Sequence, residues 1–187
     1  MSIRITSGEF RGRKIASVNG LSARPTSSAV RNAIFNILGD RIIDANIVDF
    51  FCASGTLGIE ALSHGARKCC FVENGGKALH VLRENIELLN LKDCSQVYSM
   101  NAISSINTLQ ESGEKFDILF ADPPYKKPLA IPLIKSIQGS DIINNGALLV
   151  LEMSSRENVK FPSTVNILKS RISGDTAVHF LAFEREG

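Results

Sequence analysis

Two consecutive prolines follow an aspartate at the point where an apolar stretch ends. The stretch Phe116–Ala121 is predicted as a buried strand, and Asp122, Pro123, Pro124 and Tyr125 follow it directly. Proline has no backbone N–H and a fixed φ, so the pair ends the strand and holds the chain in one direction. The Asp122 carboxylate and the Pro123 carbonyl are then two hydrogen-bond acceptors beside the Tyr125 ring.

Two acceptors beside a flat ring suit methyl transfer to an exocyclic amino group of a nucleobase. Such a nitrogen is a poor nucleophile because its lone pair is delocalised, and accepting both N–H bonds aligns it with the methyl carbon. Stacking of the base on Tyr125 would contribute roughly 1–3 kcal/mol, and the base must be unpaired or flipped out to be reached. We predict a catalytic corner of Asp122, Pro123, Pro124 and Tyr125, the alternative being a plain strand-ending turn.

The segment 49–58 has the character of a ligand-binding turn between a strand and a helix. It reads D-F-F-C-A-S-G-T-L-G, and Ala53, Gly55 and Gly58 have G-x-G-x-x-G spacing with alanine in the first place. Small residues let the backbone approach a ligand closely, although a simple strand–helix turn is equally consistent with this segment alone. Glu73 ends the next strand, where an acid can accept hydrogen bonds from ribose hydroxyls.

Polar residues end or follow four predicted strands in succession, namely Asp49, Glu73, Asn101 and Asp122. Open parallel sheets bind ligands at the carboxyl ends of their strands, so this series favours an adenosine-containing cofactor. The corner at Asp122 has no evident role in hydride transfer, which disfavours NAD, whereas a sulfonium with an activated methyl group suits it. The predicted cofactor-binding residues are Asp49, Phe51, Ala53, Ser54, Gly55, Glu73, Asn101, Ala102 and Asp122.

The elements that must position these residues alternate between strands and helices. From Ile47 onward, five continuous apolar runs alternate with amphipathic segments, which predicts a mostly parallel sheet covered on both faces. Runs on either side of Ser173-Gly174-Asp175 predict a C-terminal antiparallel hairpin. A small β-hairpin is expected within residues 3–15, and a helix capped by Thr26 or Ser27 follows it. The predicted domains are an N-terminal basic hairpin or arm, residues 1–26, and a Rossmann-like α/β domain, residues 27–187.

Composition is that of an ordinary globular protein, with 187 residues, 44% hydrophobic and 21% charged. No apolar stretch approaches the roughly 20 residues that span a bilayer, and the N-terminus does not resemble a signal peptide. We therefore expect no membrane association and a cytoplasmic location. The four cysteines form no C-x-x-C pair and no histidine lies at ligand spacing, so we expect no metal and reduced thiols.

Positive charge is concentrated at the N-terminus although the net charge is only +2. Residues 1–31 contain six basic residues against the single acid Glu9. This asymmetry fits contact with a polyanion, and a solvated basic edge is the equally weighted alternative.

Four stretches together resemble a known family, the bacterial 16S ribosomal RNA guanine-N2 methyltransferases (small-subunit rRNA methyltransferase D). In order they are RITSGEFRGRK, RPTSSAVRNAIFNIL, DFFCASGTLGIEALSHGA with FVE, and ADPPY. The last is shared with other amino-methylating enzymes, whereas the first two are much more specific. The resemblance covers essentially the whole chain.

The resemblance implies a class I methyltransferase fold, S-adenosyl-L-methionine as cofactor, and 16S ribosomal RNA or the small ribosomal subunit as partner of a monomer. It places the 49–58 turn under the methionine part, Glu73 at the ribose, and Asn101 and Ala102 at the adenine. It implies RNA phosphate contacts for the basic residues and a place near the active site for Thr26. The expected RNA-binding residues are Arg11, Arg13, Lys14, Arg24, Thr26 and Arg31.

One residue departs from the family pattern, which usually has glycine where this chain has Ala53. Its methyl group could crowd the cofactor, or the turn could need no positive φ there. Two alternatives remain at this point: another amino methyltransferase, acting on DNA adenine N6 or protein glutamine, and a non-catalytic RNA-binding protein. Little chain is left over for the recognition region of a DNA enzyme, and the intact corner at Asp122 opposes the non-catalytic interpretation.

Overall fold

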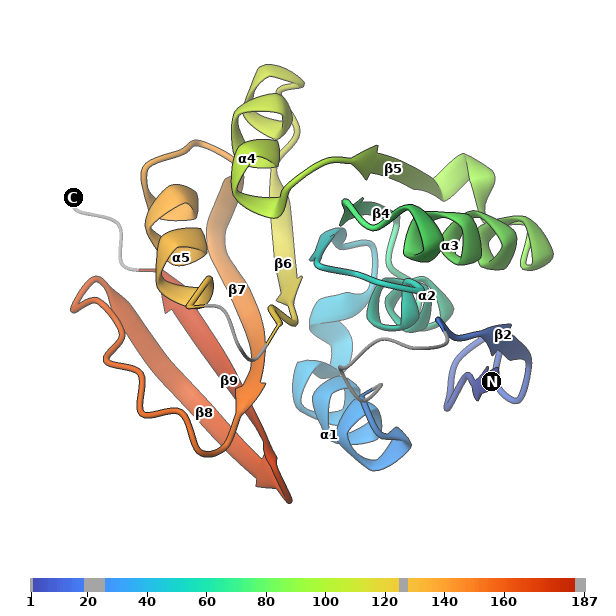
Figure 1. Cartoon of the computed structure of the whole chain (residues 1–187), viewed down its shortest axis with the longest axis horizontal. Helices are drawn as coiled ribbons and strands as arrows, with labels where there is room; N and C mark the ends of the chain where they lie inside the picture. Colours follow the sequence, from blue (N-terminus) through green and yellow to red (C-terminus); the bar gives the residue numbers. More distant parts are fainter. Residues whose placement is uncertain (1, 19–25, 125–127, 184–187) are drawn as a thin grey trace.

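The central element is a seven-stranded sheet in the order β5-β4-β3-β6-β7-β9-β8, shown in Figure 1. The computed structural model describes residues 2–18, 26–124 and 128–183. Strands β3 to β7 pair in parallel, whereas β9 lies antiparallel between β7 and β8. The sheet strands are β3 (Asn46–Phe50), β4 (Lys68–Glu73), β5 (Ser95–Ser99), β6 (Phe116–Ala121), β7 (Ile143–Ser154), β8 (Val165–Ser173) and β9 (Thr176–Phe183). The predicted α/β fold with a C-terminal antiparallel hairpin is confirmed.

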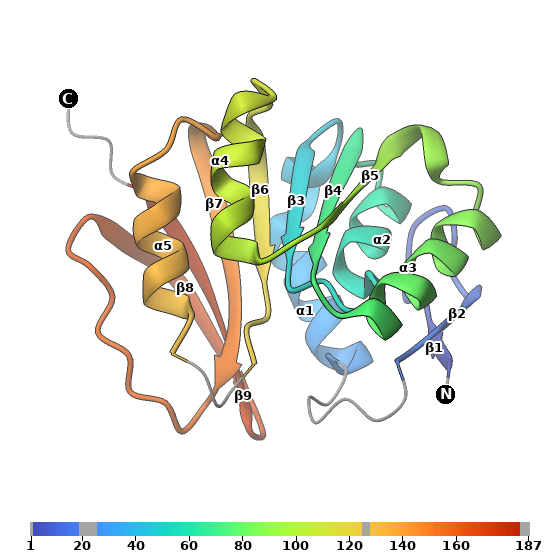
Figure 2. The ribbon, with the colours of Figure 1, turned by 45° about the horizontal axis from the view of Figure 1, so that its top comes forward.

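Helices cover both faces of this sheet, as the strand pattern predicts. They are α1 (Ser28–Leu38), α2 (Thr56–Ser63), α3 (Gly76–Leu88), α4 (Ala102–Glu111) and α5 (Ala130–Gln138), with short 3-10 helices at Gly39–Ile42 and Lys92–Cys94. One core cluster joins the sheet to α1, α2 and α3, and a second joins it to α4 and α5. Figure 2 shows α4 and α5 in front of β6 and β7, with α1 behind the sheet.

Alternate residues of each strand serve opposite core clusters, because successive side chains of a strand point to opposite faces. On β6, Ile118 and Phe120 belong to the cluster under α1–α3, whereas Leu119 and Ala121 belong to the cluster under α4 and α5. Strands buried on both faces therefore read as continuous apolar runs, which explains why the sequence shows no alternation there.

A short hairpin of β1 (Ser2–Arg4) and β2 (Lys14–Ala16) packs against the α1–α3 side of the domain. Its residues Ile5 and Ile15 are almost completely buried in the same core cluster as α2 and α3. The Asn85 side chain of α3 accepts a hydrogen bond from the Ala16 amide at 2.8 Å and donates to the Ala16 carbonyl at 2.9 Å. The described part of the predicted N-terminal arm is thus built into the core.

Helix α1 begins at a serine cap and is bounded by a glycine. The hydroxyl of Ser27 accepts a hydrogen bond from the Val30 amide at 3.3 Å, which satisfies one of the unpaired first-turn donors. Gly39, at φ 52°, ends the helix. Of the two caps that the sequence allows, the structure uses Ser27, which leaves the Thr26 side chain for another contact.

Among the described residues, none of the helices has the length and hydrophobicity needed to cross a membrane.

Candidate active site at the carboxyl edge of the sheet

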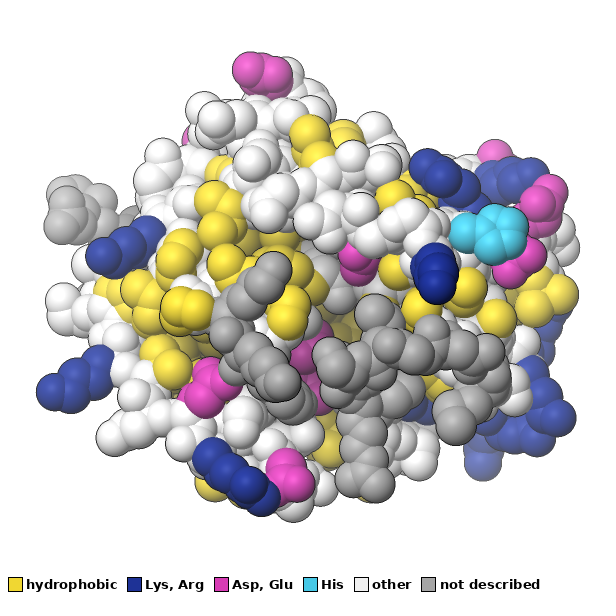
Figure 3. Space-filling view, in the orientation of Figure 1, with side chains coloured by type: hydrophobic (Ala, Val, Ile, Leu, Met, Phe, Trp, Pro, Cys, Tyr) yellow, Lys and Arg dark blue, Asp and Glu magenta, His cyan; other side chains and the backbone are white. Residues whose placement is uncertain are grey.

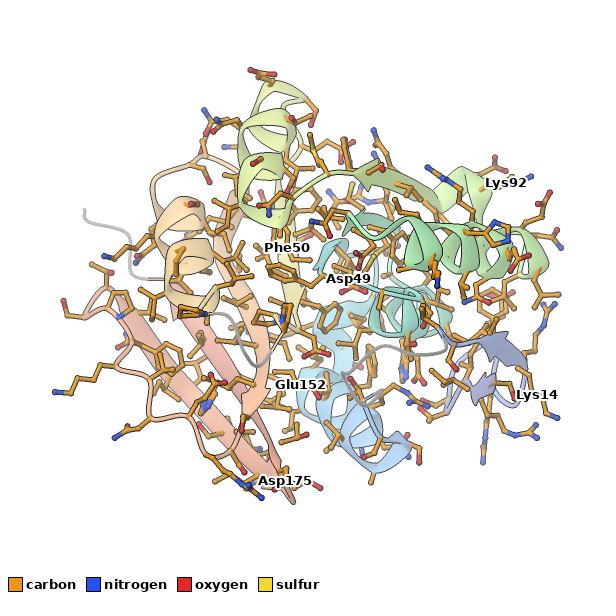
Figure 4. All side chains as sticks on the ribbon, viewed as in Figure 1. Lys14, Asp49, Phe50, Lys92, Glu152 and Asp175 are labelled. Carbon is orange, nitrogen blue, oxygen red and sulfur yellow. The ribbon has the colours of Figure 1, made fainter. Side chains whose placement is uncertain are left out.

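Four carboxylates gather at the carboxyl edge of the sheet, on the face covered by α1–α3. They continue the alternation of their strands: Ile47 and Asp49, Phe71 and Glu73, Phe120 and Asp122, and Val150 and Glu152 each lie two residues apart. Asp49, Glu73, Asp122 and Glu152 are called the edge carboxylates below. Figure 4 labels Asp49 and Glu152, and Figure 3 shows acidic side chains near the centre of the same view, bordered by apolar ones.

The turn between β3 and α2 has left-handed backbone at three of its five residues. The φ angles of Phe51, Ala53 and Gly55 are 57°, 48° and 79°. A Cβ atom on Gly55 would lie 2.4 Å from Leu82 Cδ1, so both the conformation and the packing require glycine there. The turn therefore does need a positive φ at Ala53, and the alternative that it does not is wrong.

Glu73 connects this turn to the segment that follows β4. Its Oε2 accepts a hydrogen bond from the Ala53 amide at 2.9 Å, and its Oε1 accepts from the amides of Asn74 and Gly75 at 2.9 and 2.7 Å. A carboxylate has about four acceptor sites, so these bonds orient the group and leave capacity for a ribose hydroxyl. The position fits the role that the sequence predicts for Glu73.

Asp49 lies beneath the turn. It is only 2% exposed, and its Oδ2 accepts a hydrogen bond from the Gly58 amide at 2.9 Å in the first turn of α2. Burial raises the pKa of Asp49 to about 7; the Gly58 bond opposes this shift and the charge of Glu73 adds to it. The structure thus shows Asp49 as a support for the start of α2.

Asn101 forms the N-terminal cap of α4. Its Oδ1 accepts hydrogen bonds from the amides of Ile103 and Ser104 at 2.9 and 3.4 Å, and the side chain is exposed. The carbonyl end is therefore engaged, and the amide NH₂ is the group with which Asn101 could contact an adenine. Ala102 is buried next to it, and Ser54 is buried in the turn after β3.

The predicted catalytic corner directly continues β6. The Asp122 amide donates to the Phe50 carbonyl at 3.4 Å, which extends the pairing with β3 by one residue. Asp122 is half-buried, Pro123 is buried and Pro124 is exposed, while Tyr125 lies outside the described residues. Burial, together with the charges of Glu152 and Asp49, raises the pKa of Asp122 well above its usual range.

A mostly apolar cavity of about 110 Å³ adjoins this corner. It is lined by Pro123, Pro124, Pro128, Ala130, Ile131, Met153, Glu157 and Val159. The cavity presents an apolar surface directly beside the polar groups of the corner.

Glu152 is an edge carboxylate that the sequence did not single out. It is 2% exposed, and its Oε2 accepts a hydrogen bond from the Thr26 hydroxyl at 2.8 Å. Glu152 lies inside β7, which continues to Ser154, so the strand-end criterion that selected Glu73 did not select it. Thr26 was expected among the RNA-binding residues near the active site, and the structure places it beside Glu152, almost fully buried.

Arg31 corrects one expectation. Sequence reasoning placed it among the RNA-binding residues, but it is 3% exposed and its guanidinium is engaged inside the protein. Its Nε pairs with Glu60 Oε1 at 2.8 Å, and its terminal nitrogens donate to the carbonyls of Thr26 and Arg4 at 2.6 and 2.9 Å. A buried, fully hydrogen-bonded guanidinium is a structural group, so Arg31 does not face a phosphate.

The other basic residues of the N-terminal segment lie at the surface. Arg11, Arg13 and Lys14 are exposed, and Arg13 also donates to the Leu88 carbonyl at 2.9 Å. In Figure 3 a group of basic side chains lies at the lower right, where Figure 1 places the β1–β2 hairpin. Arg24 falls outside the described residues.

The strand order, the turn after β3 and the carboxylates at the carboxyl edge define a Rossmann-like methyltransferase fold. Two solved structures share it over nearly their whole length: "Putative methyltransferase yhhF from Escherichia coli" (TM-score 0.85, 29% identity, all of both chains) and a putative methylase from Haemophilus influenzae (TM-score 0.81, 26% identity, 99% of this chain and 100% of the other).

Sequence comparison identifies the family within this class. Residues 3–182 match the family described as Conserved hypothetical protein 95, and the chain belongs to it. The chain is 35% identical to "Putative rRNA methyltransferase YlbH" of Bacillus subtilis over 89% of both chains. It is 30% identical to "Ribosomal RNA small subunit methyltransferase D" of Escherichia coli K12 over 99% of this chain and 92% of the relative. The family recognised in the sequence is confirmed.

Proposed function

We propose that this protein uses S-adenosyl-L-methionine to methylate the N2 amino group of a guanine in 16S ribosomal RNA. The observation that carries the proposal is the Asp122–Pro123 corner at the carboxyl edge of a methyltransferase sheet. Membership in a family whose relatives are named rRNA methyltransferases supports RNA as the substrate class. The partner is the 16S RNA, free or in the small subunit, and the protein acts as a monomer.

The residues of the edge fit the proposed cofactor. S-adenosylmethionine carries positive charge on its sulfonium and ammonium groups. Its binding beside the edge carboxylates would favour their ionised forms and so oppose the burial that raises the pKa of Asp49 and Asp122. Glu73 is held by three backbone amides with acceptor capacity left for a ribose hydroxyl. Phe51, Ser54 and Gly55 provide the backbone under the methionine part, and Asn101 and Ala102 border the adenine.

Bound there, S-adenosylmethionine would supply an activated methyl group to the nitrogen lone pair, and its sulfur would retain the electron pair of the former carbon–sulfur bond. The chain's own contribution is alignment. Asp122 and the Pro123 carbonyl accept the two N–H bonds of the guanine amino group and so fix the direction of its lone pair. The apolar cavity beside Pro123 and Pro124 provides one surface for the base. The ring of Tyr125 is assigned the role of stacking on the base.

The exposed basic residues of the hairpin supply the sequence-independent part of RNA binding. Arg11, Arg13 and Lys14 lie at the surface of the hairpin and are suited to contact phosphates, and Arg24 is assigned the same role. Phosphate contacts fix the position of the RNA, while the corner at Asp122 selects the reacting group.

The test is to incubate the protein with S-adenosylmethionine labelled on the methyl group and with undermethylated small-subunit RNA, intact subunits, DNA or protein extract. We expect label in RNA, and label found only in DNA or protein would refute the proposal. The Asp122→Ala variant should lose roughly 10²-fold in turnover, because it removes one of the two acceptors that align the amino group. Calorimetry should show that this variant still binds the cofactor, and unchanged turnover would refute the role of Asp122.

A further inference from the structure

Asp122, directly after β6, and Glu152, near the end of the adjacent parallel strand β7, lie side by side at the carboxyl edge of the sheet. Ala121 of β6 pairs with Leu151 of β7, so the next residue of each strand is an acid at the same level. Both acids follow residues of the α1–α3 core cluster by two positions, Phe120 and Val150, and therefore share that face. Adjacent strands are about 4.8 Å apart, which brings the two carboxylates within close electrostatic range.

A hydrogen bond from Thr26 holds Glu152 in this place. The two residues are 126 positions apart in the sequence, and the hydroxyl-to-carboxylate distance is 2.8 Å. The Thr26 carbonyl in turn accepts a hydrogen bond from Arg31, which pairs with Glu60. Glu60 also accepts hydrogen bonds from the amide and hydroxyl of Thr6 in the hairpin loop, at 3.1 and 2.6 Å. A continuous hydrogen-bond network, buried except at its Thr6 end, thus joins Glu152 to the loop of the basic hairpin.

We propose that Glu152, fixed by the Thr26 hydroxyl, is a positioning residue that makes Asp122 the acceptor of the proton lost by the base nitrogen on methylation. This inference rests on the proposed methyl transfer and names the device that prepares its catalytic carboxylate. Glu152 itself does not contact the reacting atoms, in keeping with its burial.

The proton balance explains why such a device is useful. An amino nitrogen that gains a methyl group carries a positive charge until one of its two protons leaves. Asp122 takes that proton, and the carboxylate becomes a neutral acid that later loses the proton to solvent. A neighbouring negative charge favours the protonated form of a carboxyl group, so Glu152 increases the proton affinity of Asp122 exactly where the reaction needs an acceptor.

The charged groups of the described residues that act on Asp122 come from two strands. Glu152 on β7 and Asp49 on β3 are the charged neighbours that raise the pKa of Asp122, after burial itself. Thr26, ahead of α1, donates a hydrogen bond to Glu152 from its hydroxyl. Asp49 is held by the backbone amide of Gly58, whereas Glu152 is held by a side-chain hydroxyl, so the support of Glu152 can be removed by substituting a side chain.

Glu152→Gln keeps the shape and the acceptor for Thr26 while removing the charge. The acid limb of the pH profile of kcat should move to lower pH by about one to two units. Carboxyl ¹³C NMR titration of the unliganded protein should show the same shift for Asp122. Glu111→Gln, an exposed change on α4, is the matched control and should leave both unaltered. An acid limb and an Asp122 titration that stay in place would overturn the proposal.

Thr26→Val removes the hydroxyl and retains the size of the side chain. It tests the same proposal if the Glu152→Gln protein does not fold. We expect a lower kcat with an unchanged KM for S-adenosylmethionine, and recovery of kcat in Thr26→Ser. A Thr26→Val enzyme with wild-type kcat would contradict the proposal. If the wild-type protein methylates no RNA, the proposed function fails separately, because the NMR titration needs neither cofactor nor substrate.

Discussion

Replacing Ala53 by glycine should stabilise the protein, although an alanine-to-glycine change usually has the opposite effect. Ala53 has a φ of 48°, a left-handed conformation that costs an L-residue roughly 1–2 kcal/mol. Glycine avoids this cost but adds about 0.5–1 kcal/mol of unfolded-state entropy. The net expectation is a gain of about 0.5–1 kcal/mol in the free energy of unfolding, or roughly 1–4 °C in Tm for a chain of this size.

Urea unfolding followed by circular dichroism measures this gain, with Ala33→Gly in α1 as the matched control. The control lies inside a regular helix, where glycine should cost about 1 kcal/mol. Opposite signs for the two substitutions are the expected result. Destabilisation of the Ala53→Gly protein by as much as the control would refute the assignment of strain to this turn.

The reciprocal change at Gly55 tests the same turn from the other side. Gly55→Ala would place a Cβ atom 2.4 Å from Leu82 Cδ1 at a φ of 79°, and we expect a loss of more than about 2 kcal/mol. Ala53→Gly also removes a methyl group from the backbone beneath the proposed cofactor. Calorimetry should therefore show S-adenosylmethionine binding at least as tightly as in the wild type.

Three further predictions follow from the buried and exposed charges. The folded-state pKa of Asp49 is raised from 3.8 to about 7, so its contribution to stability is complete below the lower value and is lost as pH rises through the upper one. Urea unfolding at a series of pH values measures this loss. Relative to Asp49→Asn, the free energy of unfolding of the wild type should fall by up to about 4 kcal/mol between pH 4 and 7. The same pH dependence of unfolding free energy in both proteins would contradict this prediction. Arg31→Met should cost about 3–5 kcal/mol by leaving Glu60 buried without its cation, and near-wild-type stability would count against the burial argument. Arg11→Gln and Lys14→Gln should each reduce the slope of log K against log salt for RNA binding by about 1, whereas unchanged slopes would remove these residues from the RNA contact.

Local patterns were sufficient to predict nearly every helix and strand of this fold. The apolar runs that became β3, β4 and β6 and the glycine bounding α1 are features of neighbouring residues, which sequence spacing reports directly. The two 3-10 helices were not anticipated. These depend on packing after the sheet is formed, which propensity alone does not describe.

The candidate site was predictable where a residue's role depends on its position at the end of a strand. Glu73 and Asp122 were found in this way, and both lie at the carboxyl edge. Glu152 was not found, because its role depends on the register between β6 and β7 and on the Thr26 hydroxyl, 126 residues away in the sequence. Arg31 was misjudged for a similar reason, since its partner Glu60 lies on another helix and charge counting cannot tell a buried cation from an exposed one.

The most direct test of the account is to identify the nucleoside that this protein modifies. Undermethylated small-subunit RNA is incubated with the protein and labelled S-adenosylmethionine, digested to nucleosides and analysed by mass spectrometry. The account predicts label in N2-methylguanosine with the wild-type protein and its loss with Asp122→Ala. Label in a different nucleoside, or equal label with both proteins, would contradict it.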